Sequence, residues 1–121
     1  MEVADQITID WTPPTERQRD ATLYGDGPIV AAFWAFHKAN PHVLRDIRRL
    51  AMRDHRRGVK RGMKAIFEDL RADPELSTTG SAYKLNNSYT ALYSRLVMQF
   101  TPELQGHFRV RDSSPHVIEE P

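Results

Sequence analysis

The sequence contains no cysteine and no long apolar run. The missing cysteine excludes disulfide bonds, a thiol nucleophile and every zinc site that needs a cysteine ligand, and it is typical of a cytoplasmic protein. No segment approaches the roughly 20 apolar residues of a membrane span, and the acidic N-terminus lacks the apolar core of a signal peptide. We therefore expect a protein of the cytoplasm that does not enter a membrane.

Catalytic and cofactor-binding motifs are also missing. No paired carboxylates lie in an apolar setting, and there is no glycine-rich phosphate loop. No acid joins two histidines at the spacing of a metal site. The most basic part of the chain is poor in the acids that a metal-dependent nuclease requires. We predict no enzymatic activity, no cofactor and no metal, so the chain is expected to act by binding.

What the sequence does contain is a block of positive charge. Between residues 45 and 64 there are nine Lys or Arg residues and two acids, whereas the net charge of the whole chain is only +1. Apolar residues inside the block recur at helical spacing, which indicates a folded face and not a loose tail. The alternative is a solvated face whose charges pair along a helix. Because two acids cannot neutralise nine bases, we favour a polyanionic partner.

The chain divides into an arm, a body and a tail. Residues 1–28 form an acidic, partly flexible arm with six acids and several prolines and glycines, residues 29–111 form a helical domain, and residues 112–121 form a flexible tail. The arm is either a solvated tail or a segment that folds back over the basic block and masks it. Trp11 is expected to anchor the arm against the body.

Four helices are predicted from apolar spacing and from residues that end helices. The first spans 29–39 and ends at Asn40-Pro41, since the residue before a proline avoids helical backbone angles. The second spans 41–57, with Asn40 as its N-cap and Gly58 just after its end. The third spans 62–72, and the fourth runs from 86 or 87 to about 100.

Each predicted helix has an apolar face that we expect in one shared core. In the first helix this face is Ile29, Ala32, Phe33, Phe36 and Ala39. In the later helices it is Val43 or Leu44, Ile47, Leu50 and Ala51, then Met63, Ile66, Phe67 and Leu70, and finally Tyr89, Leu92, Tyr93, Leu96 and Phe100.

Short β elements complete the predicted fold. Tyr83 and Leu85 alternate with polar residues after a turn rich in Ser and Thr, and residues 107–111 are a second strand that would pair with the first. The glycine-containing connection of residues 58–62 is typical of a helix-turn-helix. We therefore predict a mainly α fold: a four-helix domain of the helix-turn-helix or winged-helix type with one small β-hairpin.

The candidate nucleic-acid-binding residues lie on the basic block and at the start of the last helix. Lysine and arginine would meet phosphates, and asparagine near the start of a recognition helix can pair with adenine. For the two asparagines, ordinary helix capping is the alternative. The third helix, with basic residues at its entrance, is the rival recognition element. The candidate set is Arg48, Arg49, Arg53, Arg56, Arg57, Lys60, Arg61, Lys64, Lys84, Asn86, Asn87 and Arg95.

The expected partner is double-stranded DNA, with one alternative. The same basic face could bind and modulate an acidic host protein, with Trp34 or Tyr24 as an aromatic anchor. Trp34 is otherwise a core residue of the first helix. Specific DNA readers of this size are often dimers, so a homodimer is an open option, although no dimer seam is evident in the sequence.

Three short sequence elements are similar to motifs of a known group of proteins. They are Phe36, His37, Asn40 and Pro41; then Asn86, Asn87, Tyr89, Tyr93 and Arg95; then Pro102, Leu104, Phe108 and Arg111. Over about residues 33 to 111 the chain resembles a group of small proteins from tailed bacteriophages and prophages. The resemblance implies a regulatory DNA-binding protein of the helix-turn-helix or winged-helix type, acting in the cytoplasm of a bacterial host. The acidic arm lies outside it.

Overall fold

The computed structural model describes residues 11–18, 21–73 and 85–109, and in these the fold is mainly helical. Four helices of ten or more residues form the body: α3 (Pro28–Ala39), α4 (Pro41–Arg56), α5 (Met63–Ala72) and α6 (Thr90–Gln99). Shorter elements are η1 (Glu16–Gln18), α2 (Ala21–Tyr24), η2 (Asn87–Tyr89) and η3 (Pro102–Leu104). No helix within the described ranges is both long enough and apolar enough to cross a membrane.

The long helix α4 is central to the arrangement. It packs against α3, α5, α6 and η3, while α5 and α6 lie beside each other. The connection from α3 to α4 is Asn40 alone, and its side chain is buried. Its Nδ2 donates to the carbonyl of Phe36 at 3.1 Å, and it makes no side-chain cap bond to α4. Asn40 is the N-cap residue of α4, as predicted, and its carbonyl accepts the N–H of Val43 at 3.1 Å, but its side chain bonds to the helix before it.

The core is formed by the inner faces of the four long helices. Both alternatives for α4, Val43 and Leu44, are fully buried, and so are the predicted core residues Ile66 and Phe67 of α5. The ring of Phe33 contacts the rings of Tyr89 and Tyr93 at centroid distances of 5.7 and 4.8 Å. Such edge-to-face contacts join helices that are distant in the sequence.

The predicted apolar face of α3 is wrong in part. Phe33 and Phe36 are buried as expected, but Ile29, Ala32 and Ala39 are exposed. The buried face instead includes Trp34 and His37. Apolar residues surround nearly the whole of this helix, so their spacing alone does not say which side faces the core.

The predicted β-hairpin is not seen in the described part of the chain. Its first strand, near Tyr83, lies outside the described residues, and residues 107–109 of its second strand form the end of a turn and a bend. Two successive backbone hydrogen bonds turn the chain here. The N–H of Leu104 donates to the carbonyl of Thr101 at 2.8 Å, and the N–H of His107 donates to the carbonyl of Leu104 at 2.9 Å. Because Leu104 and Phe108 are both buried, the core holds this segment coiled back on itself.

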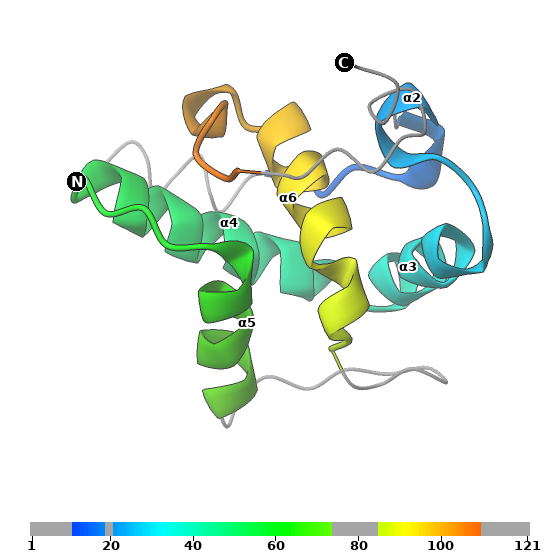
Figure 1. Ribbon diagram of the computed structural model, residues 1–121, viewed down its shortest axis with the longest axis horizontal. Helices are drawn as coiled ribbons and strands as arrows, with labels where there is room; N and C mark the ends of the chain where they lie inside the picture. Colours follow the sequence, from blue (N-terminus) through cyan, green and yellow to red (C-terminus); the bar gives the residue numbers. More distant parts are fainter. Residues whose placement is uncertain (1–10, 19–20, 74–84, 110–121) are drawn as a thin grey trace, which may run out of the picture.

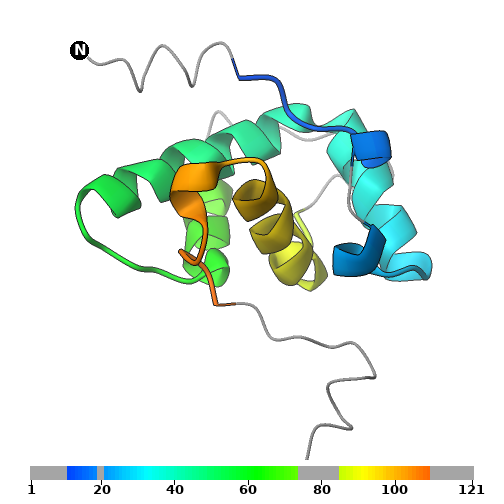
Figure 2. The ribbon, with the colours of Figure 1, turned by 90° about the horizontal axis from the view of Figure 1, so that it is seen from above.

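The described part of the arm lies against the body. Figure 2 shows residues 11–18 passing from the first half of α4 to α3. The guanidinium of Arg48 lies 4.7 Å from the centre of the Trp11 ring, and Nε2 of His37 lies 2.8 Å from the carbonyl oxygen of Pro14. Further on, Tyr24 is buried, and its hydroxyl donates to Gln99 of α6. Trp11 therefore anchors the arm, as the sequence predicted.

Candidate nucleic-acid interface

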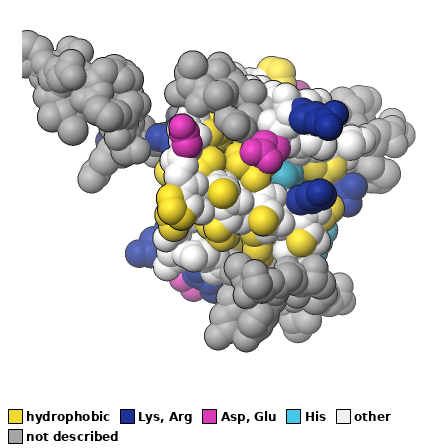
Figure 3. Space-filling model, turned by 90° about the vertical axis from the view of Figure 1, so that its right-hand side faces the viewer, with side chains coloured by type: hydrophobic (Ala, Val, Ile, Leu, Met, Phe, Trp, Pro, Cys, Tyr) yellow, Lys and Arg dark blue, Asp and Glu magenta, His cyan; other side chains and the backbone are white. Residues whose placement is uncertain are grey.

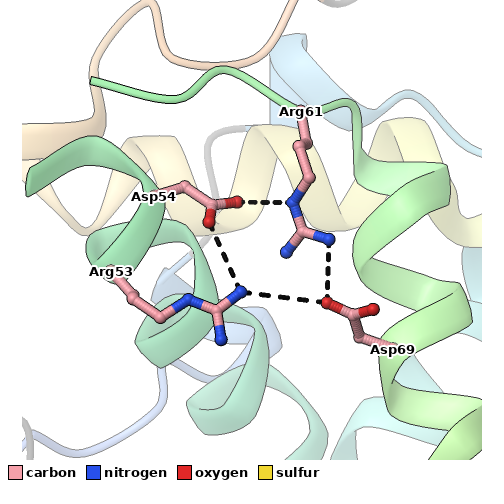
Figure 4. Close-up of polar contacts among 4 residues, drawn as sticks. All are labelled: Arg53, Asp54, Arg61 and Asp69. Carbon is pink, nitrogen blue, oxygen red and sulfur yellow. Dashed lines mark hydrogen bonds and ion pairs between the residues drawn. The ribbon is translucent and has the colours of Figure 1, made fainter. Parts of the chain in front are cut away.

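A ring of four alternating charges joins the end of α4 to α5. It consists of Arg53, Asp54, Arg61 and Asp69, and we call it the Asp54 network (Figure 4). Arg61 donates through Nε to Asp54 at 2.8 Å and pairs through Nη1 with Asp69 at 2.8 Å. Arg53 lies 3.4 Å from Asp54 and 4.0 Å from Asp69. Each acid therefore lies between two bases, and the network spans the α4–α5 connection.

The local backbone explains how Asp54 reaches across the turn. Gly58 has a φ of 71°, in the left-handed region that glycine adopts without strain, and this reverses the chain after α4. The carbonyl of Asp54 then accepts the N–H of Val59 at 2.8 Å. The Asp54 carboxylate is only 2 % exposed. Hydrogen bonds to Asp54 and Asp69 raise the pKa of Arg61, so this guanidinium stays charged.

Three arginines of the predicted interface are occupied by contacts within the protein. Arg48 is buried, and its Nε donates to the Thr101 hydroxyl at 3.2 Å. Burial lowers the pKa of Arg48, while the charge of Glu103 raises it. Arg53 and Arg61 belong to the Asp54 network. Arg48 is therefore a structural residue and not a surface contact, which corrects its place in the predicted phosphate-binding set.

Four cations remain exposed at the same turn: Arg56, Arg57, Lys60 and Lys64, which we call the turn cations. In the described ranges Arg56, Arg57 and Lys64 form no ion pair, and Nζ of Lys60 lies 3.5 Å from the carbonyl oxygen of Gly106. They follow one another through the end of α4, the connection and the first turn of α5. The acids nearest to them in the sequence are Asp54, which Arg53 and Arg61 hold, and Glu68, which pairs with Arg71 at 3.1 Å.

A histidine pair lies beside the turn. The rings of His55 and His107 lie 5.9 Å apart, edge to face, although 52 residues separate them in the chain. Burial, and then the charges of His55 and Lys60, lower the pKa of His107. Sequence reasoning missed this pair, because no local pattern relates the two positions.

The predicted base-reading asparagines are engaged at the start of α6. The side-chain oxygen of Asn86 accepts the backbone N–H of Ser88 at 2.8 Å, which is a capping bond. The oxygen of Asn87 accepts Nη2 of Arg71 at 2.6 Å. Arg71 also donates to the carbonyl of Leu85 at 3.0 Å, so it connects α5 to the segment before α6. No spacing in the sequence points to this role of Arg71.

The remaining predicted residues lie apart from the turn cations in the sequence. Arg49 is exposed and pairs with Asp46 at 3.4 Å along α4. Arg95 is half-buried on α6, and Lys84 lies outside the described residues. Beyond Lys64, the exposed side of α5 carries the acids Glu68 and Asp69, and its remaining base, Arg71, is engaged with Glu68 and Asn87.

The aromatic anchors proposed for an acidic host protein are not on the surface. Trp34 and Tyr24 are both buried, and their rings contact each other edge to face at 5.5 Å. The role of Trp34 as a core residue is therefore confirmed. The structure offers neither ring to a partner without unpacking α2 from α3.

A separate pocket of about 720 Å³ lies where the arm meets the α3–α4 junction. Three basic residues, Arg17, Lys38 and Arg45, and one acid, Glu16, are among its lining residues. It shares no lining residue with the turn cations, so it is not part of the candidate interface. Within the residues that the structure describes, no group of three or more His, Cys, Asp or Glu side chains could hold a metal ion.

Comparisons with protein-family models, with curated proteins and with solved structures found no match for this chain. The resemblance to bacteriophage proteins and the helix-turn-helix identity therefore stay predictions. The geometry of the turn is the basis on which a function can be argued.

Proposed function

We propose that this chain is a phage-type regulatory protein that binds duplex DNA, and that the turn cations contact the phosphates. The observation that carries the proposal is the separation of charges at the α4–α5 turn. Asp54 and Asp69 are paired with Arg53 and Arg61, while the turn cations stay exposed. A cluster of exposed cations on a nearly neutral protein is the electrostatic feature of a polyanion-binding surface.

The start of α5 supports the same proposal. Gly62 precedes this helix and provides no side-chain cap. The first N–H groups of a helix have no partner within it, and together with the helix dipole they attract anions. Lys64 lies in this first turn, so a phosphate there would meet both a backbone donor and a lysine charge. Phosphate contact at the turn needs no deep insertion of α5, whose later residues Glu68 and Asp69 would be repelled.

The Asp54 network gives the turn a fixed shape. Arg57 and Lys60 are on a connection that is bonded at Asp54 on one side and at Asp69 on the other. A fixed turn presents its cations without a further loss of backbone entropy on binding. About six phosphate contacts from the predicted basic set would give a slope of log affinity against log salt of about −5, but only four turn cations are exposed. The expected slope of log affinity against log salt is therefore roughly −3.5, and not −5.

Fluorescence anisotropy with a labelled random duplex tests this proposal. We expect binding at low salt, with the slope given above. R56A/K64A should remove about two units of that slope, since each neutralised phosphate contributes roughly 0.9. The matched control R45A/R49A removes the same charge from exposed positions earlier on α4 and should change the slope far less. No binding at low salt, or an equal loss for both variants, would contradict the proposal.

A further inference from the structure

The outer face of α3 is unlike that of the other long helices. Exposed positions on α4 and α5 are mostly charged, as is usual where a helix faces water. The exposed positions of α3 carry a single polar side chain, Lys38, although this helix lies at the edge of the body (Figure 1). The other exposed residues of α3 are Pro28, Ile29, Ala31, Ala32, Ala35 and Ala39.

Two large apolar side chains near the start of α3 in the sequence are exposed. Ile29 in the first turn of α3 is 49 % exposed, and Leu23 on α2 is 44 % exposed. Figure 3 shows the side of the molecule on which α3 lies, with hydrophobic side chains running across its centre. Exposed apolar side chains gathered on one side of a folded domain are typical of a site of association. The helix is apolar on both sides, which is typical of a helix that is covered on both sides.

Opposite charges lie at the two ends of this face. Asp26 precedes α3 and is exposed, and Lys38 is exposed in its last turn. Each of them is six residues from Ala32, which lies in the middle of the exposed face. If two copies of α3 pack in antiparallel orientation, the end beside Asp26 in each copy lies opposite the end that carries Lys38 in the other. The face is therefore complementary to itself in charge as well as in apolar character.

We infer that the outer face of α3 binds a second copy of this chain and forms a two-fold symmetric dimer. The two α3 helices would run antiparallel and cross at Ala32. Small side chains at a helix crossing allow the axes to approach to about 8 Å, and Ala31, Ala32 and Ala35 provide them. A two-fold axis requires the same patch on both copies, and one acid before the helix with one base in its last turn makes the patch complementary to itself.

This dimer would leave the DNA-binding surface open. The turn cations lie around the C-terminal end of α4. In Figure 1 this end is on the opposite side of the view from α3. The inference does not depend on the proposed DNA binding, because it rests only on the surface of α3 and the charges beside it. Its test needs no nucleic acid, so the two proposals succeed or fail separately.

Sedimentation equilibrium of the full chain tests the dimer. We expect a monomer–dimer equilibrium that responds to protein concentration. A35E places a carboxylate on the apolar seam of each copy and should weaken dimerisation roughly a hundredfold. A72E is the matched control, because Ala72 is exposed at the end of α5, and it should leave the dimer unchanged. Circular dichroism checks that each variant keeps its helices.

Charge reversal tests the antiparallel register. D26K alone, and K38D alone, place like charges opposite each other and should weaken the dimer roughly tenfold. D26K/K38D restores opposite charges and should recover most of the wild-type affinity. The inference is overturned if the wild type is a monomer at every concentration, if A35E is no weaker than A72E, or if the double variant is as weak as the single ones.

Discussion

Arg61 donates from Nε to the buried carboxylate of Asp54 at 2.8 Å, across a seven-residue separation that contains most of the α4–α5 connection. Arg61 belongs to the basic block of the sequence, yet here it holds an acid and not a phosphate. The same contact leaves the neighbouring turn cations as the exposed charges of this region. One ion pair thus both fixes the turn and defines which cations are available to a ligand.

The Asp54 network should contribute to stability chiefly through Asp54. In D54N the carboxylate charge is lost while Arg53 and Arg61 keep theirs. Because both arginines are partly exposed, we discount the cost of a fully buried pair and expect a loss of about 2 kcal/mol in the free energy of unfolding. Urea denaturation measures it. The control is D46N, whose exposed pair with Arg49 should be worth less than about 0.5 kcal/mol.

The turn should be sensitive to a side chain at Gly58 and tolerant of one at Gly62. Gly58 has a φ of 71°, whereas Gly62 has a φ of −72°, and a Cβ at either would meet no atom within 4 Å. Backbone strain alone therefore distinguishes them. G58A should lower the free energy of unfolding by about 1 kcal/mol and weaken DNA binding, and G62A should do less. Equal effects would show that strain at Gly58 does not shape the turn.

Arg48 should affect the arm and not the salt dependence of DNA binding. In R48A the cation above the Trp11 ring and the bond to Thr101 are both lost. We expect about 2 kcal/mol of destabilisation and a red shift of Trp11 emission, measured in a W34F background. The slope of affinity against salt should stay that of the wild type. A reduced slope would return Arg48 to the phosphate-contact set.

His37 should make the protein less stable in mild acid. Burial, opposed by the bond to the Pro14 carbonyl, lowers the pKa of His37 below its ordinary value of 6.5. The unfolded chain therefore binds a proton more readily than the folded protein. This contribution leaves stability constant above pH 6.5 and lowers it as the pH falls toward the folded pKa, by at most about 1.4 kcal/mol per pH unit.

Urea unfolding between pH 7.5 and 5 measures this dependence. H37Q, which keeps an amide near the Pro14 carbonyl, should reduce the slope. A variant slope equal to that of the wild type would assign the acid sensitivity to another group. Asp and Glu residues titrate mainly below this window and so do not obscure the result.

Local signals in the sequence were sufficient for most helix boundaries and most of the core, although α6 begins at Thr90, after η2, and not at residue 86 or 87. Asn40-Pro41 ends α3 because proline restricts the residue before it, and Gly58 ends α4 because glycine adopts left-handed angles. The apolar faces of α4 and α5 were predicted correctly because charged residues occupy the rest of each helix. The predicted face of α3 was wrong in part, since this helix has apolar residues on both sides.

The sequence by itself determined the helices, their order and the concentration of positive charge between residues 45 and 64. Tertiary structure alone decided which of those charges are exposed: it buried Arg48 beneath Trp11 and directed Arg61 to Asp54. It also turned the apolar outer face of α3 outward. The physical reason is the distance along the sequence over which each kind of interaction acts. Helix formation and helix ends depend on residues a few positions apart, whereas burial and ion pairing depend on how whole helices pack.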